Sequence, residues 1–362
     1  MRWEMQQMSK YITYFGSYAD KQSPSLYAYE FDEATGRLTF IESLSGLKDP
    51  TFIAIDEARQ LLYTYSQAVA GEASGTGLTY KIDPVSGKLS GIGEQPTSEP
   101  AATHINLDHA KRQALMVSYG GGTVSLFPLQ EDGTIGPVAD KVHHQGKSVV
   151  QGRQDSAHPH SIYTDPSDQF VIVPDLGLDK LIVYRLDRDN GKLQPHDEVA
   201  VAPGSGPRHF AFHPALPYAY VIQELSSTVT AFTYDRQNGK LTEIQSITTL
   251  PADFEGTSST AEVQISPCGS YLYGSNRGHD SIVVFSIDKD SGKLSLVQHQ
   301  STLGQHPRHF SLTPSGSYLL AANKDSNSVH VFRVDKESGK LHTTGEHISI
   351  AQPTCVRFFK QG

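Results

Sequence analysis

The sequence predicts an all-β fold, a β-propeller of seven blades, and a repeated signature is the main reason. A four-residue motif, (T/S/N)-G-(K/R)-L or a close variant, recurs along the 362 residues with its glycine at positions 36, 87, 133, 191, 239, 292 and 339. The intervals of 46 to 58 residues lie in the range of repeat architectures. The 31 Gly and 20 Pro residues indicate the many tight turns of an all-β protein. Because the repeat spans nearly the whole chain, we expect one domain over residues 9–362 and a disordered leader over 1–8.

Each repeat is expected to contain four short strands. In the unit that begins at Pro307, residues 307–314 alternate between apolar and polar, and residues 316–323 form a short apolar run after a Gly turn. Residues 327–335 alternate again, and residues 339–348 follow a second Gly turn. Four antiparallel strands repeated radially make a propeller blade, and seven blades close a ring around a central channel.

The two ends of the chain predict how this ring closes. Residues 10–18, KYITYFGSY, resemble a second strand, so the first strand of that blade is missing at the start of the chain. Residues 353–359, PTCVRFF, resemble a first strand that has no partners after it. We therefore expect the C-terminal strand to pair with the three N-terminal strands, which removes an exposed sheet edge.

Composition excludes several functional classes. The formal charge of −9 argues against a nucleic-acid or anionic membrane surface as partner, because such binding needs a basic face. No run of about 18 apolar residues and no signal-peptide pattern occur, so no membrane span is expected and a cytoplasmic location is favoured. Cys268 and Cys355 are too few for a disulfide framework, which agrees with a reducing compartment. No sequence feature marks an oligomer interface.

Equivalent positions of a repeat form rings around the predicted channel, and two such rings carry ionisable residues. The first strands begin at Pro50, Pro100, Pro159, Pro207, Pro307 and Pro353, while one unit lacks this proline. The following residues form the first ring: Thr51, Ala101, His160, Arg208, Glu262, Arg308 and Thr354. The ends of the second strands form the second ring: Ser17, Gln67, Tyr119, Asp175, Glu224, Arg277 and Lys324.

The ionisable residues of both rings gather in consecutive units. Charge at any one strand end is usually solvated or paired, but a charge that served the fold would recur in all seven units. Asymmetry within a repeat therefore indicates function. With His209 and His309 beside them, these groups make a sector that leans positive in an acidic protein. Such a pocket favours a small anionic molecule, since the planar fork of arginine binds two oxygens of a carboxylate or phosphate.

Other motifs are weaker indicators of function. The HPH motif at 158–160 places two imidazoles on one strand face, but no third metal ligand is visible at a suitable spacing, so we expect no metal and no cofactor. His143 and His144 lie in a polar connection and are expected at the surface. Gly120–Gly122 are not followed by G-K-[ST], and no G-x-S-x-G occurs, so neither a P-loop nor a serine nucleophile elbow is present.

The chain resembles the cytosolic seven-bladed propeller lactonase family, which includes one type of bacterial 6-phosphogluconolactonase and fungal carboxymuconate lactonizing enzymes. The motifs that carry the resemblance are YGGGTVSLF at 119–127, HPHS at 158–161, VPDLGLDK at 173–180, PGSGPRHFAFHP at 203–214, SNRGHDSI at 275–282 and HPRHFSLTPSG at 306–316. The resemblance implies that four positions carry the mechanism: His160 of HPH, Arg208 of GPRH, Glu224 after the next second strand, and Arg277 of NRG.

The leading hypothesis is hydrolysis of a sugar lactone, 6-phosphogluconolactone in particular. Glu224 or His160 would activate water, and Arg208 and Arg277 would stabilise the oxyanion. The expected substrate-binding residues are His158, Asp175, His209, His279, Arg308, His309 and Lys324. Two alternatives stay open at this point: a cycloisomerase that acts on a carboxylated muconate, and a non-catalytic propeller that binds a small anion or a protein partner.

Overall fold

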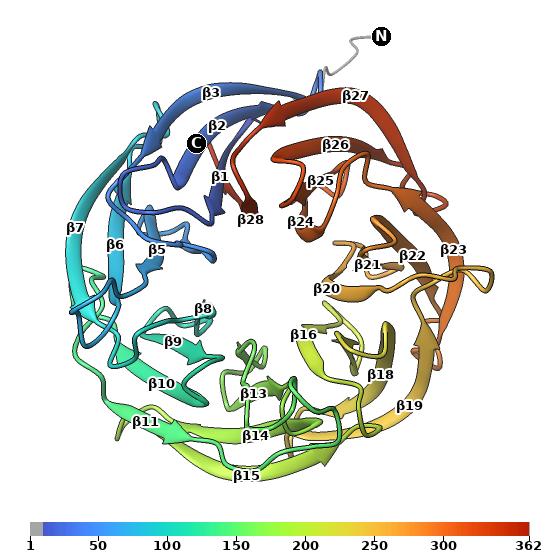
Figure 1. The fold of residues 1–362 in the computed structure, drawn as a ribbon, viewed down its shortest axis with the longest axis horizontal. Helices are drawn as coiled ribbons and strands as arrows, with labels where there is room; N and C mark the ends of the chain where they lie inside the picture. The colour runs from blue at the N-terminus through green and yellow to red at the C-terminus, as the bar shows by residue number, and fades with distance from the viewer. Residues whose placement is uncertain (1–9, 362) are drawn as a thin grey trace, which may run out of the picture.

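The computed structural model describes residues 10–361, which form seven four-stranded antiparallel sheets around a common axis (Figure 1). The prediction of a seven-bladed propeller is confirmed. The predicted leader 1–8 lies outside the described residues. No helix long and apolar enough to cross a membrane occurs between residues 10 and 361.

The blades follow one another in chain order, with the innermost strand given first. Blade 1 is β28 (Pro353–Lys360), β1 (Lys10–Ser17), β2 (Leu26–Asp32) and β3 (Arg37–Leu44). Blade 2 is β4 (Ala54–Asp56), β5 (Leu61–Ser66), β6 (Thr76–Ile82) and β7 (Leu89–Pro96). Blade 3 is β8 (His104–Leu107), β9 (Gln113–Ser118), β10 (Thr123–Pro128) and β11 (Asp140–His143). Blade 4 is β12 (Tyr163–Thr164), β13 (Phe170–Asp175), β14 (Lys180–Asp187) and β15 (Lys192–Ala200).

The remaining three blades repeat the same order. Blade 5 is β16 (Pro207–Phe212), β17 (Tyr218–Gln223), β18 (Thr228–Asp235) and β19 (Lys240–Thr248). Blade 6 is β20 (Ser259–Ile265), β21 (Tyr271–Arg277), β22 (Ser281–Ile287) and β23 (Leu294–Ser301). Blade 7 is β24 (Pro307–Leu312), β25 (Tyr318–Asn323), β26 (Ser328–Val334) and β27 (Leu341–Ser349).

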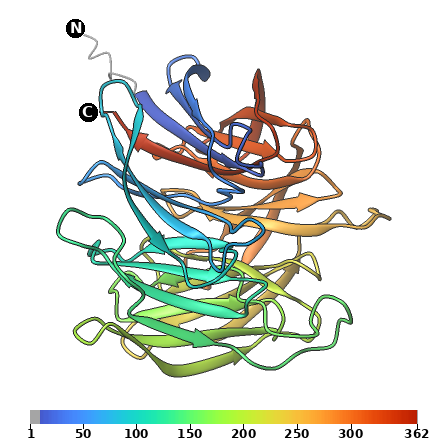
Figure 2. The ribbon, with the colours of Figure 1, turned by 60° about the vertical axis from the view of Figure 1, so that its left-hand side comes forward.

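The ring closes as the sequence predicts. β28 pairs antiparallel with β1, from Tyr11 opposite Lys360 to Gly16 opposite Cys355, and the two strands lie side by side in both views (Figure 1, Figure 2). The hydroxyl of Thr354 donates to the carbonyls of Gly16 and Thr51, both at 3.1 Å, and so ties the closing strand to blade 1 and to the segment that enters blade 2. Closure leaves no inner strand without a partner.

Blades are held together by apolar side chains and by a repeated tyrosine bond. The repeat glycines all adopt positive φ, between 61° and 84°, because the tight turn between third and fourth strands requires it. In four places a buried tyrosine of a second strand donates to the carbonyl of the repeat glycine in the next blade, for example Tyr273 to Gly339 at 2.9 Å. The signature therefore fixes a turn and also an inter-blade contact.

Candidate active site

A polar cavity of about 390 Å³ lies at one mouth of the ring, where first strands begin and second strands end. Its walls come from six blades and from the segment between β11 and β12. The lining residues are Tyr18, Thr51, Gln67, Ala102, Thr103, Tyr119, Arg153, His160, Glu224, Ser259, Arg277 and Arg308. Glu224 is the only carboxylate among them.

Glu224 is buried and accepts bonds from three guanidinium groups. Its Oε1 lies 2.5 Å from Nη2 of Arg153, and its Oε2 lies 2.9 Å from Nε of Arg208 and 2.9 Å from Nη2 of Arg277. Burial opposes ionisation of this carboxyl group, but the charges of Arg277, Arg208 and Arg153 outweigh it and hold its pKa well below the usual range. Glu224 is therefore a carboxylate at any physiological pH.

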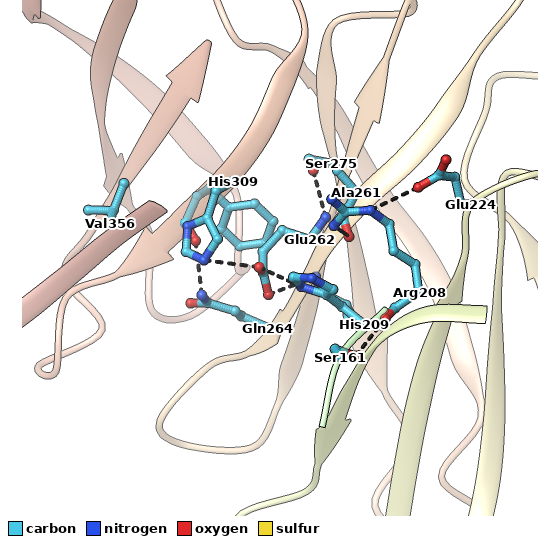
Figure 3. Close-up of polar contacts among 12 residues, drawn as sticks. Ser161, Arg208, His209, Glu224, Ala261, Glu262, Gln264, Ser275, His309 and Val356 are labelled. Carbon is cyan, nitrogen blue, oxygen red and sulfur yellow. Dashed lines mark hydrogen bonds and ion pairs between the residues drawn. The ribbon is translucent and has the colours of Figure 1, made fainter. Parts of the chain in front are cut away.

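Backbone carbonyls of β20 fix the two buried arginines. Nη1 of Arg208 donates to the carbonyl of Ala261, and Nη2 of Arg277 donates to the carbonyl of Thr260, each at 2.5 Å. Burial and the neighbouring charges of Arg277 and Arg308 lower the pKa of Arg208 to about 9, so the group remains a cation at neutral pH. Figure 3 shows the side chain of Arg208 extended between Glu224 and the β20 backbone.

His160 faces the same cavity without a hydrogen-bonding partner. Its Nδ1 is buried and unpartnered, and no bond to the other ring nitrogen occurs within residues 10–361. Burial, and then the charge of Arg208, hold its pKa well below the usual value, so the imidazole is neutral at pH 7. An unprotonated ring nitrogen that borders a polar cavity is able to accept a proton.

Arg308 supplies a cation that no carboxylate neutralises. It lines the cavity from the start of β24, and its guanidinium lies 5.4 Å from the ring centroid of Tyr18. Within the described part of the chain it forms no ion pair. Arg153, Arg208 and Arg277 bond Glu224, and Arg308 is a fourth guanidinium group at the site, so the site attracts anions.

The structure brings His160, Arg208, Glu224 and Arg277 together, although they are scattered over the sequence. Of the seven predicted substrate-binding residues, only Arg308 is among those that line the cavity. His158 stacks on Tyr119 at 4.3 Å and does not border the cavity, while His279 packs against Phe254 and His299. Lys324 pairs with Asp325 outside the cavity, and Asp175 is fully buried within blade 4.

Strand register explains why Asp175 was misplaced in the second ring. Gln223, Asn276 and Asn323 each pair with the first residue of the third strand, and Asp175 pairs with Lys180 in the same way. The true equivalent of Glu224 in blade 4 is therefore Leu176. Side chains of consecutive strand residues point to opposite faces, so this shift of one residue removes Asp175 from the cavity.

Glu262 was also misaligned by one residue. Val263 pairs with Gly274 two residues before Asn276, as Phe210 pairs with Val221 two residues before Gln223, so Ala261 is the equivalent of Arg208. Glu262 instead occupies the position of His209 and His309. Both imidazoles bond its Oε2, at 2.9 and 3.0 Å (Figure 3).

The cluster of His209, Glu262 and His309 lies deeper along the axis than the cavity. The ring of Phe52 contacts both imidazoles and His104 contacts that of His209, and none of these five residues lines the cavity. Burial lowers the pKa of His209 to about 4 despite the nearby carboxylate. The two histidines predicted to bind substrate thus lie behind the site rather than in it.

One further expectation, about a residue in a connection, needs correction. His144 is buried rather than exposed: its Nδ1 bonds Asp175 and its Nε2 bonds the hydroxyl of Tyr184, both at 2.7 Å. His143 is exposed, as expected. Sequence reasoning missed Arg153, which lies outside the repeat, although the longest interval between repeat glycines, 133 to 191, shows where the extra segment is.

No group of three or more His, Cys, Asp or Glu side chains that could hold a metal ion occurs in residues 10–361. Cys268 and Cys355 are free thiols. The side chains at the site offer arginine cations, one carboxylate, a neutral imidazole and the hydroxyl and amide groups of the wall.

Comparison with known proteins agrees with this geometry. The model of the lactonase family, described as a seven-bladed β-propeller, matches residues 12–358. The chain belongs to this family. A 6-phosphogluconolactonase of Bacillus subtilis is 35% identical over 354 residues, which cover 98% of this chain and 100% of the relative. A 6-phosphogluconolactonase of Formosa agariphila is 32% identical, over 83% of this chain and 85% of that one.

Solved structures of lactonase-family proteins superpose over nearly the whole chain. A periplasmic gluconolactonase of Pseudomonas aeruginosa matches with a TM-score of 0.92 and 32% identity, covering 98% of this chain and 100% of that chain. A protein of Bacteroides fragilis described as a putative 6-phosphogluconolactonase matches with a TM-score of 0.89 and 27% identity, covering 98% and 99%.

Proposed function

We propose that this protein hydrolyses a sugar lactone, and specifically converts 6-phosphogluconolactone to 6-phosphogluconate, a step of the pentose phosphate pathway. The observation that carries the proposal is a buried carboxylate, Glu224, that bonds three guanidinium groups at a cavity whose wall also holds Arg308 and a neutral imidazole. The names of the similar proteins support lactones as the substrate class.

The side chains that line the cavity suggest how the substrate is bound. Arg308 forms no ion pair within residues 10–361, so its guanidinium donors are available for the phosphate or another negative group of the ligand. Thr51, Gln67, Thr103 and Ser259 offer hydroxyl and amide groups that suit the hydroxyls of a sugar.

His160 is the better candidate for the base than Glu224. Both oxygens of Glu224 already accept bonds from guanidinium groups, whose charges favour the ionised carboxylate and oppose its protonation. His160 is neutral at pH 7 and no partner occupies its ring nitrogens. A positioned base of this kind contributes about 10²- to 10⁴-fold to the rate.

In the proposed reaction His160 takes a proton from water while the water oxygen forms a bond to the ring carbonyl carbon. The carbonyl oxygen becomes an oxyanion, and Arg277 and Arg153 stabilise it from the cavity wall. When the bond from this carbon to the ring oxygen breaks, the proton on His160 passes to that oxygen, which leaves as a hydroxyl. The product is the open-chain acid, which ionises in water.

A phosphorylated sugar is charged and does not cross a membrane unaided, so this substrate favours a cytoplasmic location of the enzyme. The proposed partner is thus a small anionic lactone. Relatives differ in this respect, since one similar structure is a periplasmic gluconolactonase.

The test is a direct assay of lactone opening. Purified protein is mixed with 6-phosphogluconolactone, with unphosphorylated gluconolactone and with a carboxymuconate, and acid or lactone formation is followed against the spontaneous rate. We expect fast hydrolysis of the phosphorylated lactone. Lactonization of the muconate instead would indicate a cycloisomerase, and no turnover with tight binding of 6-phosphogluconate would indicate a binding protein.

A further inference from the structure

The turn between β13 and β14, Asp175–Asp179 with the sequence DLGLD, holds the loop of residues 144–158. The carboxylate of Asp175 contacts both ends of this loop, because its Oδ2 bonds Nδ1 of His144 at 2.7 Å and its Oδ1 accepts from the backbone N–H of His158 at 2.8 Å. The same Oδ1 accepts from Gly177 and Leu178, at 3.0 and 3.1 Å, so the carboxylate is fixed within its own turn.

Gly177 and Asp179 contact the loop between these ends. A Cβ atom on Gly177 would lie 1.9 Å from the carbonyl oxygen of Ser156, so this turn and the loop touch backbone to backbone. The hydroxyl of Ser148 donates to Oδ2 of Asp179 at 2.6 Å. A buried Gln154 adds a bond from its Nε2 to the carbonyl of Leu176, at 2.8 Å.

The loop carries Arg153, the only cavity arginine that comes from outside the strands and their ends. Its side chain is 43% exposed, and the contact with Oε1 of Glu224 is its ion pair to the site. No strand runs through residues 144–158. The contacts with the β13–β14 turn hold the loop along its length, while bonds of His144 to Tyr184 and of His158 to Tyr119 hold its two ends as well. If the loop were not fixed, substrate binding would have to order this long side chain, and that would lower the affinity for substrate.

We propose that the Asp175–Asp179 turn is a positioning element that orders the 144–158 loop and so places Arg153 against Glu224 over the cavity. This role rests on the proposed lactone hydrolysis, and it reassigns Asp175 from contact with substrate to support of an arginine that contacts it. The DLGLD sequence then has a physical explanation: two carboxylates receive the loop, and a glycine between them lets the two backbones meet.

The substitution Gly177→Ala tests the proposal most directly. Gly177 does not have positive φ, so alanine is compatible with the backbone of the turn. The added Cβ would meet the loop, at the carbonyl of Ser156 and at the backbone nitrogen of His158, 2.8 Å away. We expect faster hydrogen exchange in residues 148–156 and a loss of about tenfold or more in kcat/KM, as for removal of one charge-assisted contact. Gly91→Ala is the control, because Gly91 is exposed on β7 and a Cβ there meets only Tyr80 at 3.7 Å.

A double-mutant cycle separates this role from general destabilisation. If Gly177 acts through Arg153, then Gly177→Ala should change kcat/KM less than about twofold in a protein that already carries Arg153→Ala. The same reduction factor in both backgrounds, or no effect in the parent protein, would overturn the proposal. If Gly177→Ala does not fold, Ser148→Ala removes one bond to Asp179 at the surface and should show the same dependence on Arg153 with a smaller effect.

Failure of the positioning proposal can be told apart from failure of the proposed lactone hydrolysis. If no lactone is hydrolysed, the same cycle is measured on the Kd of 6-phosphogluconate by calorimetry, and coupling there supports the positioning role although the reaction is wrong. If 6-phosphogluconate does not bind either, both proposals are overturned.

Discussion

The substitution Glu224→Gln removes the single negative charge from the arginine cluster while keeping the shape of the side chain. Glu224 is 5% exposed and bonds three guanidinium groups at 2.5, 2.9 and 2.9 Å. A glutamine amide has one acceptor oxygen, and its nitrogen is a donor that would face another donor. Arg208 and Arg277 would thus stay buried without their counter-ion.

The size of the expected loss of stability follows from the burial of these charged groups. Breaking a buried ion pair by removal of one partner costs about 3–5 kcal/mol, so the free energy of unfolding should fall by about that amount. Loss of the fixed donor arrangement around the reacting oxygen should lower kcat by about 10²- to 10³-fold. The cavity also gains positive charge, so we expect KM for the phosphorylated lactone to stay the same or fall.

The assay compares steady-state hydrolysis of 6-phosphogluconolactone and thermal unfolding for the parent protein, Glu224→Gln and a control. Glu198→Gln is the matched control, because Glu198 is 60% exposed and its pair with Lys180 is of the kind that contributes little. An unchanged kcat would remove Glu224 from the mechanism. A rise in KM with kcat intact would show that it serves binding alone.

Three further predictions follow from the site and its surroundings. His160→Gln should lower kcat about 10²- to 10⁴-fold. In the parent protein, the fall of kcat/KM on the acid side should have its midpoint below pH 6.5, because the pKa of His160 is lowered. A midpoint above that pH would contradict the role of His160 as base. Arg308→Gln should raise KM for 6-phosphogluconolactone about 10- to 100-fold and leave KM for gluconolactone nearly unchanged, whereas equal changes for both would exclude phosphate recognition. Thermal stability should decrease from pH 7 to pH 5, because unfolding lets buried imidazoles take up protons below pH 6.5. His209, with its pKa lowered to about 4, accounts for roughly 2 kcal/mol of the loss over this interval, and a Tm independent of pH would refute this.

The fold could be predicted from sequence because the same unit occurs seven times, so each expected turn or strand can be checked against its equivalents in the other units. The glycine at 339 and its equivalents mark a turn that needs positive φ, and alternation marks the strands around it. Ring closure was predictable because KYITYFGSY and PTCVRFF each lack partners nearby in sequence.

The site was only partly predictable, and strand register is the main reason. Blade 6 begins without a proline. Thr260 pairs with Asn276 in its place, as Pro207 pairs with Gln223, and without this landmark Glu262 was aligned one residue off. For Asp175 the error was in the end of a second strand. A one-residue error exchanges the two faces of a strand and moves a side chain from the cavity to the blade interior.

Arg153 could not be placed from sequence at all. Its position depends on bonds made by His144, Ser148 and Gln154 to a turn in another part of the chain, and no repeat predicts such contacts. An arginine in a loop has no periodic pattern that gives its direction.

The pairing of β28 with β1 has a consequence for biosynthesis. β28 follows the other 27 strands in sequence, yet it is the innermost strand of blade 1 and contacts β24 and β4 as well as β1. While the ribosome is still at work, blade 1 lacks that strand and blades 1 and 7 cannot be joined. Nascent chains are therefore open arcs with unpaired edges, which makes them candidates for chaperone protection until the final strand docks.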